Sequence, residues 1–382
     1  MTSRSDSRAG PGNAASQPAS FEIVSFTGDS GLADYAVSLA RALAVHHQAS
    51  VITSIALPSR FDGMGFNVFR IFRRSRHYFL DIPKFLAHVL RRRPDWIVLQ
   101  GPLKFAFLDG LWIRLLRLCG QKAAITVHDV LPHYPKPWSR FSYGFYYRSF
   151  NRVIAHSDRA RGELGGLGIR GPVLVVPHGI YDVFKLTGIS REQARQRIGG
   201  LANDDFVVLF FGNLEPRKGL MEFLGAAQQL AGERQIKFLI AGADYMTSHG
   251  KACADALAEA GGKPNVVLRA SRIPFEEVEN FFSACDLVAL PYLEGTTSGV
   301  LKLALAFERP MVATSVGDFP EQVPADAGLL IEPGERLVGE LAEAIKRIRV
   351  NQADYVDGVR KAGAHAQWPD IAAKVADHLA KD

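Results

Sequence analysis

Residues 206–220 read FVVLFFGNLEPRKGL and contain a complete strand–turn–helix signal. The first six residues are continuously apolar, which is typical of a strand buried on both faces of a parallel sheet. Gly212 and Asn213 begin a turn, and Gly219 begins a pattern that predicts a helix from 220 to about 231. A buried strand followed by a short turn and a helix is the repeating unit of α/β folds.

The same unit recurs on both sides of this segment. Short apolar runs occur at 21–26, 51–55, 96–99, 123–127, 152–155, 173–176, 237–242, 265–268, 287–291, 310–314 and 328–331. Helical patterns lie between many of them, so we predict two doubly wound Rossmann-like units. Residues 1–20, rich in Ser, Gly, Ala and Pro, are expected to be a disordered leader. The units are expected at 21–180 and 181–365.

Composition excludes several classes of protein. The chain has 382 residues, 47% hydrophobic and 22% charged, which argues against a disordered or fibrous protein. No apolar run approaches the roughly 20 residues of a membrane span. The three cysteines are too scattered for a disulfide framework or a zinc site. Residues 1–185 carry a net charge of +12 and the remainder −6, so the first half is expected to face an anionic surface or substrate.

Two loops of the second half carry signals for anion binding. Arg217 and Lys218 stand just before the helix that begins at Gly219. The segment 290–301 places small residues and hydroxyls at a second helix start, behind Glu294. Free N–H groups and the dipole at a helix N-terminus favour phosphate. The alternative is an ordinary polar loop with solvated charges, in which Thr297 or Ser298 is only a helix cap.

Two loops of the first half follow predicted strands. The turn TGDSGLAD, residues 27–34, lacks the full G-x-G-x-x-G spacing and supports an NAD site only weakly. Close backbone approach is still expected at Gly28 and Gly31. His128 ends another strand and is expected to point into the cleft. His178 is expected to have a structural role in a turn between the two units.

Together these loops resemble those of retaining glycosyltransferases with the GT-B fold, in the branch called glycosyltransferase family four or group 1. The turn 212–219, the segments 156–158 and 176–179, and the segment 310–317 followed by Pro320 and Glu321 carry the resemblance. It spans about residues 21–380. The fold it implies is α/β, with two doubly wound domains facing each other across a cleft. It also implies that residues 366–382 form a helix that packs back towards the first domain.

The reaction implied by the resemblance is metal-independent transfer of a sugar, with retention, from a nucleotide-sugar to a hydroxyl of a lipid-linked or polysaccharide acceptor. The implied catalytic residues are His128, Arg217, Lys218 and Glu294. The implied donor-binding residues are Gly212, Asn213, Thr297, Ser298, Gly299 and Val300, and the implied acceptor-binding residues are Gly28, Ser30, Gly31 and Asp129. Cations and a helix end would stabilise the leaving diphosphate, and no Asp-x-Asp pair follows a strand, so no metal or other cofactor is expected.

One departure from the family pattern keeps an alternative open. The family usually has a second Glu eight residues after the first, and here Lys302 or Leu303 stands at that site. A non-catalytic protein that binds a nucleotide-sugar is therefore the alternative. A basic nucleic-acid-binding protein is the second alternative, although no nucleic-acid motif is present and nucleic acid is not an expected partner.

Basic and apolar residues are interleaved in the first half, at 69–80, at 84–93 and at 104–117. This pattern suits a surface that lies on anionic lipid. The alternative is that the apolar residues form core and the arginines are solvated. Together with the +12 charge, and with the lipid-linked acceptors frequent in the family, the pattern predicts a cytoplasmic protein held peripherally on the inner face of the cytoplasmic membrane.

Overall fold

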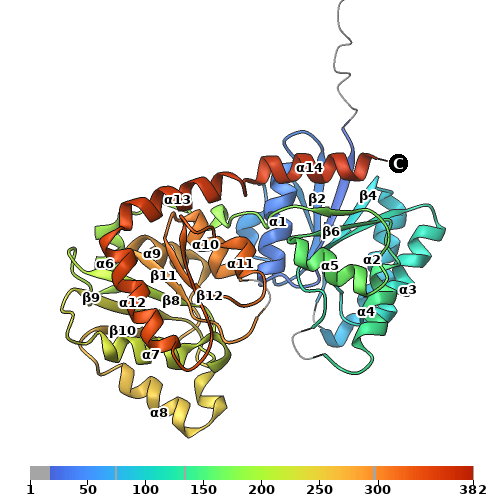
Figure 1. Cartoon of the computed structure of the whole chain (residues 1–382). Helices are drawn as coiled ribbons and strands as arrows, with labels where there is room; N and C mark the ends of the chain where they lie inside the picture. Colours follow the sequence, from blue (N-terminus) through green and yellow to red (C-terminus); the bar gives the residue numbers. More distant parts are fainter. Residues whose placement is uncertain (1–17, 74, 133–134, 296–297, 382) are drawn as a thin grey trace, which may run out of the picture.

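The computed structural model describes residues 18–73, 75–132, 135–295 and 298–381, so most of the predicted leader lies outside it. The described chain forms two parallel sheets, each covered by helices on both faces (Figure 1). The predicted class, two doubly wound α/β units, is confirmed. The exact domain limits at 20, 180 and 365 stay predictions.

The first sheet has the strand order β3-β2-β1-β4-β5-β6-β7. Its strands are β1 Ser20–Val24, β2 Gln48–Ser54, β3 Asn67–Phe72, β4 Trp96–Leu99, β5 Lys122–Val127, β6 Arg152–Ala155 and β7 Val173–Val175. The chain turns from one side of β1 to the other between β3 and β4. Ligands of such sheets bind at this switch point, beyond the carboxyl ends of the strands.

Helices cover both faces of the first sheet because alternate strand residues point to opposite sides. Ile23 packs in a core with α1, and Val24 packs in the opposite core with α2, α3 and α4. The helices of this half are α1 Gly31–Leu43, α2 Tyr78–Arg92, α3 Ala106–Leu118, α4 Ser139–Tyr147 and α5 Asp158–Gly166. Short 3-10 helices occur at η1 Ser59–Phe61, η2 Ser75–His77 and η3 Asp182–Phe184.

The second sheet repeats this topology, with the order β10-β9-β8-β11-β12-β13. Its strands are β8 Phe206–Phe211, β9 Ile236–Ala241, β10 Val266–Arg269, β11 Leu287–Leu290, β12 Met311–Thr314 and β13 Gly328–Ile331. The run at 206–211 is therefore one strand of six residues, as predicted. Its neighbours β9 and β11 place a second switch point at its carboxyl end.

The helices of the second half also lie on both faces of their sheet. They are α6 Arg191–Ile198, α7 Leu220–Gln229, α8 Lys251–Ala260, α9 Phe275–Ala284, α10 Gly299–Ala306, α11 Phe319–Gln322, α12 Leu337–Val350 and α13 Gln352–Ala364, with 3-10 helices η4 Pro216–Lys218 and η5 Met246–His249. The sequence did not predict α13. The last helix, α14 Trp368–Ala380, crosses to the first half and packs beside α1 (Figure 1).

The strand β3 and the helix α2 correct the sequence interpretation of residues 69–93. Residues 67–72 form a strand paired with β2, and Phe72 is buried. Tyr78 and Phe85 of α2 are also buried in the core, so part of this segment follows the core alternative. Phe79 and Leu80 remain exposed. Within the described residues, no helix is long and apolar enough to span a membrane.

Candidate active site

Three loops at the carboxyl edge of the second sheet pack against one another through their backbones. Gly219 has φ +73°, and a Cβ there would lie 1.8 Å from the carbonyl oxygen of Pro291, in the loop after β11. A Cβ on Gly242, after β9, would lie 1.7 Å from the oxygen of Gly212, after β8. Only glycine permits this approach, so these glycines hold the loops in one compact edge.

Lys218 lies at the centre of this edge. A Cβ on Gly212 would be 3.3 Å from Lys218 Nζ and 3.6 Å from a methyl of Val300, so the ammonium, the glycine backbone and the start of α10 are neighbours. Burial lowers the pKa of Lys218 to about 8. No salt bridge of Lys218 occurs within the described part of the chain. The charge is therefore available to an anionic ligand.

Arg217 points to a different partner. Its Nε donates to Oε2 of Glu215 at 2.6 Å. Burial opposes ionisation of Glu215, but the Asn213 side chain and the charges of Arg217 and Lys218 hold its pKa below the usual value. Glu215 was not among the predicted site residues. The loop therefore presents one paired cation, Arg217, and one cation without a salt bridge, Lys218.

The N-terminus of α10 is the second predicted phosphate cradle. Ser298 is at the N-cap position, but its side chain makes no cap hydrogen bond and instead pairs with the hydroxyl of Tyr292 at 3.1 Å. The simple capping role is therefore wrong for Ser298, and the first N–H groups of α10 have no side-chain cap from it. Thr297, also predicted here, lies outside the described residues. Glu294 is exposed on the loop that leads to this helix.

The start of α7 lies where it was predicted. A 3-10 turn, η4, occupies 216–218, and α7 begins at Leu220, directly after Gly219. Gly219 is buried against Pro291, as described above, and Leu220 is fully buried. The N-terminal end of α7 is thus covered by protein, which leaves the start of α10, beside Lys218 and Gly212, as the helix start that could bind an anion.

Tyr181 joins the predicted acceptor turn to the predicted donor helix. Its hydroxyl donates to the carbonyl oxygen of Gly31 at 3.1 Å. A Cβ on Gly299 would lie 3.2 Å from the Tyr181 ring. The N-termini of α1 and α10 therefore approach each other from the two halves with this one side chain between them. Ser30 is the N-cap residue of α1 and makes no side-chain cap hydrogen bond.

A cavity of about 400 Å³ lies between the halves and is lined by residues of both. Gly28, Gly212 and Asn213 face it, so predicted acceptor and donor residues share one space. Leu303 lines it as well. Lys302, the other residue at the second-Glu position, is buried outside the lining and donates to Gln322 Oε1 at 2.8 Å.

Charged residues line the same cavity and link its two walls. Arg272 Nη2 lies 3.3 Å from Asp29 Oδ2 across the cleft, and Arg60 forms an ion pair with Glu276. Asp34, at the start of α1, also faces the cavity, and burial raises its pKa to about 7. The cavity lining thus holds three carboxyl groups and two guanidinium groups, and both guanidinium groups already form ion pairs within it.

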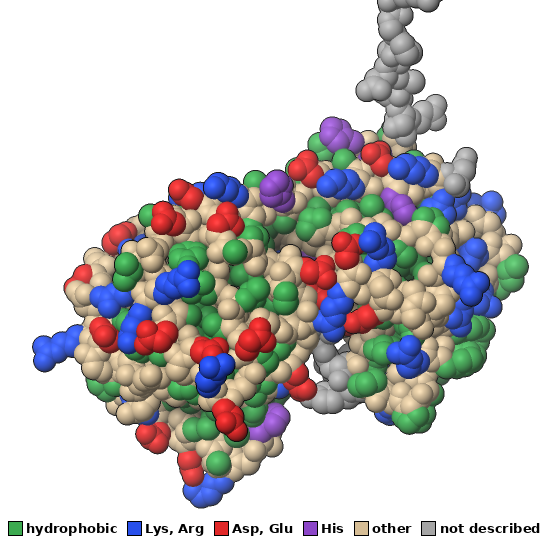
Figure 2. All heavy atoms as spheres, viewed as in Figure 1, with side chains coloured by type: hydrophobic (Ala, Val, Ile, Leu, Met, Phe, Trp, Pro, Cys, Tyr) green, Lys and Arg blue, Asp and Glu red, His purple; other side chains and the backbone are tan. Residues whose placement is uncertain are grey.

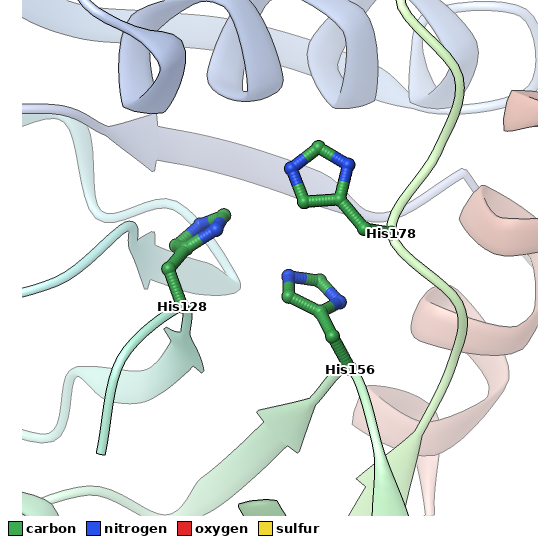
Figure 3. A group of neighbouring side chains, drawn as sticks. All are labelled: His128, His156 and His178. Carbon is green, nitrogen blue, oxygen red and sulfur yellow. The ribbon is translucent and has the colours of Figure 1, made fainter. Parts of the chain in front are cut away.

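His128 belongs to a group of three histidines at the carboxyl edge of the first sheet (Figure 3). It follows β5, His156 follows β6, and His178 comes shortly after β7. Burial lowers the pKa of all three, that of His156 to about 4. They are therefore neutral at pH 7. Asp129, the residue after His128, accepts a hydrogen bond from the Tyr147 hydroxyl at its carbonyl oxygen.

The structure separates the predicted residues into three places. The donor-side group lies at the edge of the second sheet, the acceptor turn lies across the cavity from it, and His128 lies in the histidine cluster. Sequence reasoning missed Tyr181, Glu215, Arg60 and Glu276. Tyr181, Arg60 and Glu276 are positioned by contacts with residues distant in the sequence, and Glu215 by a turn of its own loop. No local sequence pattern marked any of them as a site residue.

Comparisons with known proteins give a consistent result for both halves. Residues 30–182 match the family model described as Glycosyltransferase Family 4, and residues 205–351 match the model described as Glycosyl transferases group 1. A D-inositol 3-phosphate glycosyltransferase of Mycolicibacterium smegmatis is 32% identical over 206 residues, which are 52% of this chain and 45% of that protein. The match thus spans less than half of the relative's length.

Two solved structures match the whole architecture. Anabaena Alr3699/HepE, solved in complex with UDP and glucose, aligns with a TM-score of 0.74 at 18% identity, over 95% of this chain and all of that one. Sucrose-phosphate synthase of Thermosynechococcus elongatus aligns with a TM-score of 0.71 at 20% identity, over 94% and 98% of the two chains. At these identities the likeness shows the fold, and the predicted GT-B architecture is confirmed.

Proposed function

Because the chain belongs to the group 1 and family 4 glycosyltransferases, we propose that it transfers a sugar, with retention, from a nucleotide-sugar to an acceptor hydroxyl. The observation that carries the proposal is the meeting of the Lys218 ammonium, the Gly212 backbone and the start of α10 at the switch point of the second sheet. A diphosphate is the part of a nucleotide-sugar that such a place would recognise.

The leaving group supplies the chemical reason for this arrangement. Its negative charge grows as the glycosidic bond breaks, and fixed positive charge in a site with little water stabilises it. Lys218 and the N–H groups of α10 supply that charge without a metal ion. Arg217, held by Glu215, contributes through the field of the loop and keeps Glu215 ionised. His128 would contact the donor sugar from the first half.

A nucleotide-sugar donor is supported by the likeness to Alr3699/HepE, whose structure was solved with UDP and glucose. The donor would extend from α10 into the cavity, where Gly212 and Asn213 form one wall. No carboxylate stands at Leu303, so the ribose would be bound there by shape and not by a charged acceptor. Arg60 of the first half and Arg272 of the second also line that space.

The acceptor would enter from the first half, over Gly28, Ser30, Gly31 and Asp129. We propose a hydroxyl of a lipid-linked or polysaccharide glycan. One relative is named as a D-inositol 3-phosphate glycosyltransferase, so a phosphate-bearing polyol is the second class of acceptor to test. Arg60 and Arg272 suit a phosphate in either acceptor.

Membrane association is supported by a surface on the first half, which we call the α2–α4 patch. Its exposed apolar residues are Phe79, Leu80, Phe105, Phe107, Leu111, Leu115, Leu118, Trp138 and Phe141. Four of them pack in pairs, since Phe79 stacks on Phe105 and Phe107 on Phe141. Basic residues interleave with them, and Figure 2 shows blue and green side chains gathered over this part of the molecule.

The α2–α4 patch suits the interface of an anionic bilayer, where apolar side chains enter the headgroup region and cations meet the phosphates. Lys104 lies over the ring of Phe105 and Lys136 over that of Trp138, so the charges sit beside the aromatic residues. A peripheral location on the inner face of the cytoplasmic membrane would bring the cleft to a lipid-linked acceptor.

The proposed activity is tested by incubating the protein with a panel of nucleotide-sugars and three acceptors: a polyprenyl-linked glycan, an oligosaccharide and an inositol phosphate. Transfer is measured by mass spectrometry, and the anomeric configuration of the product by NMR. Donor binding without transfer or hydrolysis would support the non-catalytic alternative. Absence of any nucleotide-sugar binding, together with binding to nucleic acid, would overturn the proposal.

Membrane association is tested by co-sedimentation with neutral and anionic vesicles. We expect binding to anionic vesicles at low salt, weakened at high salt because ions screen the attraction. The double variant Phe79→Asp, Leu115→Asp should lose it, whereas the control Val350→Asp, at an exposed apolar position of α12, should not. Equal partitioning to both kinds of vesicle would contradict the anionic-lipid surface and leave the transferase proposal standing.

A further inference from the structure

The histidine cluster at the edge of the first sheet brings together three imidazoles, of which the proposed reaction uses only His128. His128, His156 and His178 follow β5, β6 and β7, which are consecutive neighbours in the sheet. Parallel strands bring their carboxyl ends to one edge, and here they bring three imidazoles together. One ring nitrogen from each residue lies within 4.8 Å of the other two.

Hydrogen bonds determine which nitrogen of each ring is available. His156 Nδ1 lies 3.2 Å from the carbonyl oxygen of Val176, and His178 Nδ1 lies 2.8 Å from that of Gly179. A carbonyl oxygen can only accept, so these nitrogens carry the proton and each Nε2 carries a lone pair. His128 Nε2 lies 3.2 Å from Oε1 of Gln100, which leaves a lone pair on its Nδ1.

The available nitrogen of His156 has no partner. His156 is only 7% exposed, and its Nε2 is buried without a hydrogen bond within the described part of the chain. A buried acceptor without a partner costs free energy. Figure 3 shows one ring nitrogen of His156 and one of His178 turned towards His128. The unpaired nitrogen therefore faces the other two rings and not the bulk solvent.

We propose that the three imidazoles bind a divalent transition-metal ion of the zinc class. Histidines that ligate a metal almost always donate their other N–H to a carbonyl or carboxylate, and all three rings have such an acceptor. Imidazole nitrogen suits zinc, copper, nickel and cobalt, and the absence of carboxylates from this three-residue group disfavours magnesium and calcium. Burial of the neutral rings leaves them ready to bind without losing a proton.

Metal binding requires the three ligand nitrogens to move closer together. Zn–N bonds of about 2.0–2.1 Å place tetrahedral ligand nitrogens roughly 3.3 Å apart. One nitrogen of each ring lies within 4.8 Å of the other two, and binding requires the rings to turn inwards to the shorter spacing. Tyr35 packs its ring against those of His128 and His178, with centroids 4.7 and 4.9 Å apart, and shields one side of the cluster. A water or a ligand atom would complete the coordination from the cleft.

Bound metal would also affect transfer, and this consequence rests on the proposed function. His128 is the first-half residue proposed to contact the donor sugar. A metal ion that holds its Nδ1 restrains the ring and places a cation beside the donor. We therefore expect the loaded protein to transfer sugar more slowly than the metal-free protein.

The test uses the full chain, freed of metal with a chelator that is then removed, and titrated with Co²⁺ while the visible spectrum is recorded. We expect one equivalent to bind with the intense absorption of a tetrahedral site, and added Zn²⁺ to displace it. His156→Ala and His178→Ala should each weaken binding by 10-fold or more. The control His249→Ala, at an exposed position on η5, should bind as the parent does.

Circular dichroism and thermal unfolding show whether each variant folds, and the unsubstituted chain tests the site even where a variant does not. No tetrahedral cobalt spectrum from the folded parent protein would overturn the proposal, as would undiminished binding in folded His156→Ala. Binding is read without any transfer assay. A protein that binds metal but transfers no sugar therefore fails only the proposed function.

Discussion

The carboxyl edges of the two sheets use the same strand order for opposite chemistry. In the second half, the edge presents Lys218 and the N-terminus of α10, which has no side-chain cap from Ser298, and both suit an anion. In the first half, the edge presents three neutral histidines, of which His156 and His178 are buried, and these suit a cation. The topology places a site at each edge, and the loops determine what the site binds.

The two edges also differ in how they are held. The second is built on backbone contacts at Gly219 and Gly242 that leave no room for a side chain. The first is built on side-chain contacts among aromatic rings, with Tyr35 at their centre. A backbone-held edge resists displacement, whereas rings can turn within their packing.

The largest expected effect comes from removing the Lys218 ammonium at the edge of the second sheet. Lys218→Ala should lower kcat/KM for transfer by about 100-fold, because one donor to a developing anion is worth on the order of 3 kcal/mol. Steady-state transfer assays measure this. The control Lys251→Ala removes an exposed lysine of α8 and should change little. A folded Lys218→Ala protein with near-normal activity would contradict the role of this edge.

The second-largest expected effect is on stability, and it tests the backbone contacts that hold the edge of the second sheet. Gly219→Ala and Gly63→Ala both add a Cβ at positive φ, +73° and +80°, but only the first meets a neighbouring backbone. The shared strain costs about 1 kcal/mol. We expect Gly219→Ala to lower the free energy of unfolding by roughly 2 kcal/mol more, because the loop after β11 must move. Equal denaturant midpoints for the two variants would show that this edge is not rigid.

A smaller effect is the pH dependence of the free enzyme. Lys218 is charged below its pKa of about 8 and neutral above it. The value of kcat/KM for the donor should therefore fall as pH rises through 8, approaching 10-fold per pH unit. Lys218→Arg should abolish this fall, since arginine keeps its proton. Parallel profiles for both proteins would assign the titration to another group.

The smallest expected effect is the response to EDTA, which separates the two edges directly. The second edge meets the leaving-group charge with protein groups, so transfer should continue at an undiminished rate. The first edge would lose any bound metal, which should not slow the reaction. Loss of activity with EDTA and rescue by Mg²⁺ or Mn²⁺ would show that the second edge needs a metal ion.

Much of the second edge could be predicted from sequence because its signals are local. The run 206–211, Lys218 and the small residues around Gly299 lie beside the strands and helices they serve. Their structural context corrected only details, such as the covered end of α7 and the pairing of Arg217 with Glu215. Residues close together in sequence keep their relation whatever surrounds them.

The first edge could be predicted only in part. His128 was expected in the cleft, but His178 was interpreted as a turn residue, and His156 was noticed only through a family resemblance. The three are separated by 28 and 22 residues in the sequence, and no local pattern connects them. The strand β3 was missed for a different reason: it lies at the edge of the sheet, and Arg70 interrupts the continuous apolar run that marks a buried strand.

The sequence by itself determined the two doubly wound units, most of their strands and helices, and the loops that carry glycine and charge. Those features depend on periodicity and on residues within one strand–turn–helix unit. Only the tertiary structure decided that Tyr181 bridges α1 and α10, that three histidines share one edge, and that the α2–α4 patch stays exposed. These depend on which strands become neighbours and on which faces the packing leaves uncovered, and both are properties of the assembled chain.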